Sequence, residues 1–166
     1  MRRISTLVAA CILAGLTATI SAEVIRYPLP NNSTFPIAQA VETSASTVLI
    51  HHSGTVPRPA NPEAERGSAE YWGDTEAQAL SCFERMQASF ENLGVSYGDV
   101  IKMTVFLVGT PETEGRMDFS GFMKAYTQYF GTEAQPNLPA RSAVQVAGLA
   151  SEGMLVEIEV ILARPE

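Results

Sequence analysis

Cysteine and histidine are scarce in this sequence of 166 residues. Cys11 and Cys82 are the two cysteines, and Cys11 lies in an N-terminal segment that we expect to be removed. One remaining thiol cannot form an intrachain disulfide, and the helical pattern around Cys82 favours buried packing over a nucleophilic role. The two histidines, His51 and His52, are neighbours in a predicted strand, so they point to opposite faces and are not expected to chelate one metal ion. A glycine-rich phosphate loop, a cluster of metal ligands and a Ser-His-Asp arrangement are also missing.

Basic residues are few as well. The sequence has 11 Lys and Arg against 18 Asp and Glu, a net charge of −7. Loss of an N-terminal segment containing Arg2 and Arg3 takes the net charge to −9. Binding to nucleic acid depends on clustered Lys and Arg, and the remaining basic residues form no stripe. We therefore expect no nucleic-acid partner, which disfavours an endoribonuclease.

The N-terminus has the layout of a cleavable signal peptide spanning residues 1–22. Arg2 and Arg3 precede an apolar run from Leu7 to Ile20, and the small residues Ser21 and Ala22 follow it. A transmembrane anchor is the alternative, but the run is shorter than the ~20 residues that a span requires. A lipoprotein signal ending at Cys11 is a third possibility, although its apolar core is very short. We expect an exported, periplasmic or secreted protein with no stable membrane insertion and a single domain over residues 23–166.

Apolar patterning predicts six strands and two helices in the mature domain. The first helix starts at Asp74 or Thr75 and stops at Gly94, and the second runs from Asp118 to Phe130. The stretch 55–72 is rich in proline and charge and predicts a long surface loop, where Tyr71 and Trp72 either pack or line a cleft. The predicted strands are residues 24–27, 38–42, 47–52, 100–108, 141–147 and 155–163.

This order of elements is typical of an α+β domain in which two helices cover one face of a mixed β-sheet. We expect the last two strands to form a hairpin about residues 148–153. Helices on one face leave the other face of the sheet exposed, which favours oligomerisation.

Several segments resemble, in the same order, landmarks of the Rid family (also called the YjgF/YER057c/UK114 family). The resemblance implies a chorismate-mutase-like fold, a homotrimer with ligand clefts between subunits, and imine or enamine deaminase activity that needs no cofactor. The segments are Gln39, Ser53-Gly54, residues 73–78, residues 99–107, Pro139-Ala140-Arg141-Ser142 and residues 156–159.

Arg141 is the one charge in an otherwise uncharged predicted strand. A guanidinium binds a carboxylate through two parallel, charge-assisted hydrogen bonds. A structural ion pair at the start of the strand is the alternative. The resemblance implies that Arg141 binds the carboxylate of a 2-imino or 2-enamino acid, and that backbone groups near Ala143 hold the imine nitrogen.

Glu157 and Glu159 share one face of the last predicted strand, between Val, Ile and Leu residues whose burial favours acid–base chemistry. The resemblance favours Glu157 as the residue that orients the attacking water, whereas a solvated outer face is the preferred interpretation for Glu159. In the predicted hairpin, Arg141 faces Val160, so Arg141 and Glu157 lie ~10 Å apart within one subunit. A compact site would more easily take them from two chains.

Three further residues are candidates for substrate contact. Ser53 either hydrogen-bonds a ligand or stabilises a turn. Deaminase-type relatives have a tyrosine after Gly-Pro, whereas here Phe35-Pro36 is followed by Ile37, and Met123 replaces an asparagine. These apolar replacements favour a larger, more apolar ligand or a loss of catalysis.

The leading hypothesis is therefore a hydrolytic deaminase that converts 2-imino and 2-enamino acids into ammonia and a 2-keto acid. A non-catalytic binding module for small carboxylates on the same scaffold is the alternative. An endoribonuclease is third, because of the negative charge.

Overall fold

The structure is a computed structural model that describes residues 24–164, so the predicted signal peptide lies outside the described residues. Six strands form one mixed sheet in the order β1-β2-β5-β4-β6-β3. Within residues 24–164, no helix is both long and apolar enough to cross a bilayer. The strands are β1 (Val24–Pro28), β2 (Ala38–Thr43), β3 (Leu49–Thr55), β4 (Val100–Val108), β5 (Ala140–Val146) and β6 (Val156–Ala163), and the helices are α1 (Ala69–Trp72), α2 (Thr75–Leu93) and α3 (Phe119–Tyr126).

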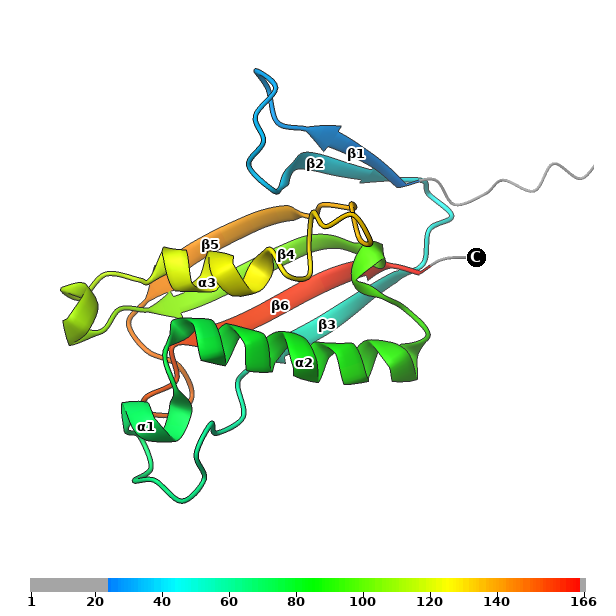
Figure 1. Ribbon diagram of the computed structural model, residues 1–166. Coiled ribbons are helices and arrows are strands. Elements are labelled where there is room, and N and C mark those ends of the chain that lie inside the picture. The colour runs from blue at the N-terminus through cyan, green and yellow to red at the C-terminus, as the bar shows by residue number, and fades with distance from the viewer. Residues whose placement is uncertain (1–23, 165–166) are drawn as a thin grey trace, which may run out of the picture.

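Helices α2 and α3 lie on the same face of the sheet (Figure 1), which confirms the predicted α+β architecture. Asp74 caps α2 by accepting a hydrogen bond from the Ala77 N–H at 2.9 Å, and Gly94 ends the helix in the left-handed conformation at φ 68°. The apolar stripes of both helices pack on alternate residues of β4 and β6. Fully buried members of this core are Phe83, Met86, Phe90, Met103, Val105, Leu107, Phe122, Tyr126, Val156 and Ile158.

Helix α3 is shorter than predicted, because it ends at Tyr126 and not at Phe130. Asp118, at which the helix was predicted to begin, caps its first turn. After Tyr126 the chain continues in tight turns, in which the N–H groups of Tyr129 and Phe130 both donate to the Tyr126 carbonyl. These turns still bury Phe130, so the apolar spacing that suggested a longer helix reflects burial of the turn.

The predicted hairpin between the last two strands is wrong. Strand β4 lies between β5 and β6, pairing parallel with β5 and antiparallel with β6. Parallel neighbours require a crossover connection, and the segment containing α3 supplies it between β4 and β5. The connection 147–155 then carries the chain past β4 to the far side of that strand.

Strands β1 and β2 form a hairpin that diverges from the rest of the sheet (Figure 1). Its single pairing with β5 joins Ala38 to Ala140, so the edge of β5 beyond Ala140 has no strand partner in the described part of the chain. Arg26 of β1 fastens the hairpin by donating to the carbonyls of Gly98 at 2.8 Å and Leu138 at 2.9 Å.

The predicted loop 55–72 ends in the short helix α1 and packs against the connection 147–155. Tyr71 and Trp72 are buried with Met154, and the Trp72 indole N–H donates to the Glu152 carbonyl at 2.7 Å. These two aromatic residues are therefore packed, as the default interpretation had it, and they also line a surface groove of about 480 Å³. The strand predicted at 47–52 instead spans Leu49–Thr55.

Candidate functional site

The side chain of Arg141 lies on the helix-covered face of the sheet, because its partner in β4 is the core residue Met103. Four aromatic rings surround the guanidinium carbon, at 4.2 Å to the ring centroid for Tyr126, 5.2 Å for Phe122, 5.5 Å for Phe35 and 5.7 Å for Phe119. Phe35 belongs to the connection between β1 and β2, and the other three rings belong to α3. We call Arg141 and these four rings the Arg141 cluster.

The guanidinium of Arg141 includes a donor that lacks a hydrogen-bond acceptor within the described residues. Its Nη1 atom is buried and has no hydrogen-bond partner, and no described carboxylate pairs with it, so the predicted alternative of a structural ion pair is not found within residues 24–164. Burial lowers the pKa of Arg141, an effect that the nearby Tyr126 opposes. A buried donor without an acceptor is costly, and an anion that accepts two hydrogen bonds from the guanidinium removes that cost.

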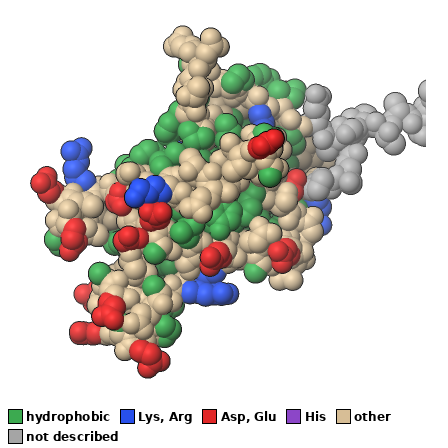
Figure 2. All heavy atoms as spheres, viewed as in Figure 1, with side chains coloured by type: hydrophobic (Ala, Val, Ile, Leu, Met, Phe, Trp, Pro, Cys, Tyr) green, Lys and Arg blue, Asp and Glu red, His purple; other side chains and the backbone are tan. Residues whose placement is uncertain are grey.

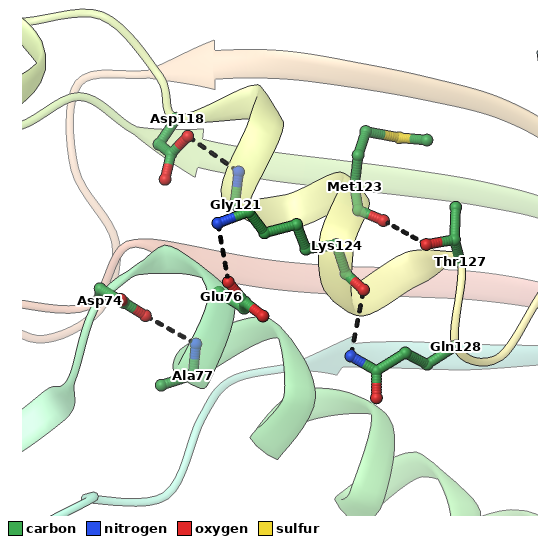
Figure 3. A network of polar contacts seen from close by, with 9 residues as sticks. All are labelled: Asp74, Glu76, Ala77, Asp118, Gly121, Met123, Lys124, Thr127 and Gln128. Atoms are coloured by element: carbon green, nitrogen blue, oxygen red, sulfur yellow. Dashed lines mark hydrogen bonds and ion pairs between the residues drawn. The ribbon is translucent and has the colours of Figure 1, made fainter.

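Capping and one ion pair position the helix that carries three of the rings (Figure 3). The Asp118 carboxylate accepts a hydrogen bond from the Gly121 N–H at 2.8 Å, and Lys124 pairs with Glu76 of α2 at 3.3 Å. Met123 points away from α2 in this view and is partly buried against the core, one turn after Phe119. Met123 thus adds an apolar side chain to the helix that forms the Arg141 cluster.

Ile37 lies beside Phe35 at the start of β2. The Ile37 N–H donates to the Phe35 carbonyl at 2.8 Å, and both side chains line a groove of about 360 Å³ together with Leu29 and Leu138. Ile37 is therefore part of a mostly apolar groove next to the Arg141 cluster.

Ala143 follows Arg141 on the same face of β5, in register with the core residue Val105. Its small side chain is partly buried against the core. Because β2 pairs with β5 only at Ala140, backbone groups on the outer edge of β5 near Ala143 are available to a ligand or to another chain.

Glu157 occupies the opposite face of the sheet. It lies between Val156 and Ile158, both fully buried under the helices, so its own side chain points to the face that the helices leave open. The carboxylate lies directly against Gly54 of β3, where a Cβ would overlap it. We call Ser53, Gly54 and Glu157 the Glu157 region.

Ser53 is exposed at an irregularity in the pairing of β3 with β6. It lines a groove of about 260 Å³ on the open face together with His51, Lys102, Thr104 and Glu159. The groove thus places polar side chains beside Ser53, whereas the half-buried Glu157 pairs in register with Phe106 of β4.

Arg141 and Glu157 therefore do not meet within one subunit. The hairpin from which the ~10 Å separation was inferred is not formed, because β4 lies between the two strands, and the two side chains leave the sheet in opposite directions. One subunit brings Arg141 together with aromatic rings and Ala143, and brings Glu157 together with Ser53 and Gly54.

Of the remaining candidates, His52 and Cys82 pack on the helix-covered face, whereas His51 lines the groove with Ser53. The His52 ring packs edge-on against Phe90 and its Nε2 lies 2.9 Å from the Ser89 hydroxyl, whereas His51 is exposed, so the two histidines do point to opposite faces. Residues 24–164 contain no group of three or more His, Cys, Asp or Glu side chains that could hold a metal ion. Burial raises the pKa of Cys82 to about 12, which keeps this thiol protonated and suited to packing.

The contribution of the aromatic rings to the site was not predicted. Phe119, Phe122 and Tyr126 have the spacing of an ordinary core stripe, and the sequence assigned them to the core for that reason. Their second role, surrounding the Arg141 guanidinium, becomes visible only when the strand that carries Arg141 is placed beneath α3.

Comparisons with known proteins identify the family and agree with the fold. The model of a family described as "Endoribonuclease L-PSP" matches residues 31–164. A "RutC family protein" of Haemophilus influenzae is 34% identical over 129 residues, covering 78% of this chain and 87% of that protein. The "2-iminobutanoate/2-iminopropanoate deaminase" of Escherichia coli K12 is 34% identical over 116 residues, covering 70% and 80%. The crystal structure of "E. coli TdcF with bound serine" superposes with a TM-score of 0.54 at 32% identity, covering 80% of this chain and 91% of that one. The matched model, these relatives and the shared fold lead to one conclusion, that the chain belongs to the Rid family.

Proposed function

We propose that the protein is a hydrolytic deaminase that converts 2-imino and 2-enamino acids into 2-keto acids and ammonia. The observation that carries this proposal is the buried Nη1 of Arg141, which lacks an acceptor and lies among four aromatic rings. A substrate carboxylate supplies that acceptor in the geometry that a guanidinium fork prefers. A relative named as a deaminase of 2-iminobutanoate and 2-iminopropanoate supports the same reaction class.

The reaction needs a water molecule and a base. With the substrate carboxylate on Arg141, water adds to the protonated imine carbon while Glu157 accepts a proton from that water, which forms a C–O bond and a carbinolamine. Glu157 then returns the proton to nitrogen, the C–N bond breaks, and ammonia leaves as the second water proton is lost and the C=O bond forms. An enamine first takes a proton on carbon to become the imine. Backbone groups near Ala143 hold the nitrogen during these steps.

The protonated imine is itself electrophilic, so the proposed reaction uses no cofactor or metal. Ser53 serves the same step by hydrogen-bonding the water or the substrate on the Glu157 side. Ile37 and Met123 line the approach to the carboxylate and supply apolar contact to the rest of the substrate.

We further propose a homotrimer whose clefts each combine Arg141 of one subunit with Glu157 of its neighbour. The positions of these two side chains on opposite faces of one sheet support a shared site. The open sheet face and the free edge of β5 supply contact surface for the neighbouring copy, and Val144 on that face is 42% exposed. A closed cyclic assembly uses the same pair of surfaces in every contact. We also propose export, on the basis of the predicted signal peptide.

A coupled assay tests the proposed function. 2-Aminoacrylate is generated in situ, and pyruvate release above the uncatalysed rate is followed for the wild type, Arg141→Ala and Arg141→Lys. We expect acceleration by the wild type and a loss of about 100-fold or more in Arg141→Ala. Arg141→Lys keeps the charge but not the fork, so we expect intermediate activity. No acceleration by the wild type with several imino acids would refute the deaminase proposal.

A non-catalytic carboxylate-binding module is the second candidate. The replacement of a phenol and an amide by Ile37 and Met123 favours it, because both changes remove polar contacts from the proposed site. Calorimetric binding of 2-keto acids that depends on Arg141, combined with no turnover of any 2-imino acid, would identify this case. Ribonuclease activity is not proposed, because the helix-covered face shows scattered Lys and Arg side chains and many acidic ones (Figure 2).

A further inference from the structure

The four rings around Arg141 differ in their exposure. Phe122 and Tyr126 are fully buried, Phe119 is partly buried, and Phe35 is 41% exposed. Phe35 therefore lies on the solvent side of the guanidinium, and the other rings form its floor. A ligand that approaches Arg141 from solvent meets Phe35 first.

Phe35 is held in this position by contacts from both sides. The Tyr126 hydroxyl donates to the Pro36 carbonyl at 2.8 Å, which fastens the following residue to α3. The Phe35 ring stacks on Phe119, with centroids 6.4 Å apart and an interplanar angle of 20°. Its N–H donates to the Ser33 hydroxyl at 3.3 Å. An exposed aromatic ring that is fixed in this way offers a rigid apolar surface at low entropic cost.

Phe35 also forms one wall of the groove of about 360 Å³ that Ile37, Leu29 and Leu138 line. The volume falls in the ~300–1,000 Å³ range of small-ligand sites. Arg26, Ser33, Thr34 and Asn137 also line the groove, and none of its lining side chains is acidic. Because Phe35 contacts the guanidinium and the groove, a ligand whose carboxylate binds Arg141 can extend past this ring into a groove whose lining is mostly apolar.

We infer that Phe35 is a specificity-determining residue, and that it directs the site towards 2-imino acids with a large apolar side chain, aromatic ones above all. This inference rests on the proposed deaminase function. A phenyl group stacks on Phe35 and enters the groove, whereas the methyl group of 2-iminopropanoate reaches neither. One additional methylene in an apolar site changes kcat/KM by about 10- to 200-fold, so a phenyl group is large enough to decide the preference.

The test compares two substrates in three proteins. An L-amino-acid oxidase generates the 2-imino acids from L-phenylalanine and L-alanine, and keto-acid release above the uncatalysed rate is measured for wild type, Phe35→Ala and Val48→Ala. We expect the wild type to prefer the phenyl substrate by about tenfold or more in kcat/KM, mainly through KM. We expect Phe35→Ala to lower this ratio at least about fivefold. Val48 is an exposed apolar residue outside the Arg141 cluster and the groove, so Val48→Ala should leave the ratio unchanged. Equal kcat/KM for both substrates in the wild type, or an unchanged ratio in Phe35→Ala, would overturn the inference.

A binding measurement separates failure of this inference from failure of the proposed function. Calorimetry with phenylpyruvate and pyruvate, the two keto-acid products, needs no turnover. We expect tighter binding of phenylpyruvate to the wild type and loss of that difference in Phe35→Ala. A wild type that hydrolyses neither imino acid but shows this binding pattern refutes the deaminase and retains the role of Phe35. Turnover of both substrates with no difference in binding between the two keto acids refutes the role of Phe35 and retains the deaminase.

Discussion

The Arg141 cluster and the Glu157 region stand on opposite faces of one sheet, and their surroundings differ in kind. Aromatic rings enclose the Arg141 guanidinium and leave one nitrogen without an acceptor. The Glu157 carboxylate instead lies against the backbone at Gly54, beside the exposed Ser53. Removal of water strengthens electrostatic binding of an anion, whereas hydrolysis needs water near the base. This difference is the basis of our proposal that the first surface binds the substrate and the second carries out the chemistry.

Replacement of Glu157 by Gln should give the largest effect and the sharpest contrast between the two surfaces. Loss of a general base lowers kcat by about 10²- to 10⁴-fold. Because the Arg141 cluster is untouched, we expect pyruvate and phenylpyruvate to bind as they do to the wild type. For Arg141→Ala we expect the opposite for binding: calorimetry should show that this variant no longer binds the keto acids. Equal loss of binding in both variants would remove the distinction between the two surfaces.

Gln78 tests how the Glu157 side is held in place. This buried side chain donates to the carbonyls of Gly73 and Gly153, at 3.0 Å each, and accepts from the Leu155 N–H at 2.7 Å, so it ties α2 to the connection that leads into β6. Gln78→Ala leaves three backbone groups unpaired, and we expect it to lower the free energy of unfolding by about 2–3 kcal/mol.

Urea denaturation measures this loss, with Gln87→Ala as the matched control. Gln87 lies on the same helix but is exposed and bonds only to Glu91, so its replacement should cost no more than about 0.5 kcal/mol. A similar loss in both variants would mean that the network around Gln78 has no special role.

A side chain at Gly54 would disturb the Glu157 carboxylate without touching the Arg141 cluster. We expect Gly54→Ala to lower kcat by about tenfold, because the base is displaced from its position, while KM changes little. Gly148→Ala is the control, since a Cβ there meets no atom within 4 Å. Steady-state kinetics of both variants would contradict the account if Gly54→Ala changed KM and left kcat intact.

The smallest expected effect concerns the Arg141 side. Tyr126→Phe removes the hydrogen bond to the Pro36 carbonyl, and we expect a loss of about 1 kcal/mol in the free energy of unfolding. Burial raises the pKa of Tyr126 to about 12, so this contribution is complete below the ordinary tyrosine pKa of about 10 and is lost as pH rises from there through about 12. Urea denaturation at pH 6 and pH 9 should therefore give the same difference. A difference present at pH 6 and absent at pH 9 would contradict this assignment.

Much of the fold was predictable from local patterns. The two helix caps at Asp74 and Asp118, the one-sided helices and the alternation that places Glu157 and Glu159 on one face all follow from spacing. The position of β4 between β5 and β6 could not be predicted in this way, because hydrophobic periodicity identifies a strand without identifying its neighbours. Proximity in the sequence suggested a hairpin, and the parallel pairing through α3 overrode it.

The site was also predictable only in part. Arg141 was identified as the one charge in an uncharged strand, but its face was not, because β5 mixes small, polar and apolar residues. The rings of Phe119 and Tyr126 could not be distinguished from core residues until the strand beneath them was known. Phe35 lies in a connection, where no periodic pattern relates a side chain to a distant strand.

The most direct test of the account is a mixture of two inactive variants. Arg141→Ala and Glu157→Gln are prepared separately, then unfolded and refolded together in equal amounts, and deaminase activity is compared with that of each variant refolded alone. If every site takes Arg141 from one subunit and Glu157 from its neighbour, random assembly restores about a quarter of the wild-type activity. Refolding of the wild type is the positive control. If the mixture is no more active than the mean of the two inactive variants, the result would contradict a site shared between subunits.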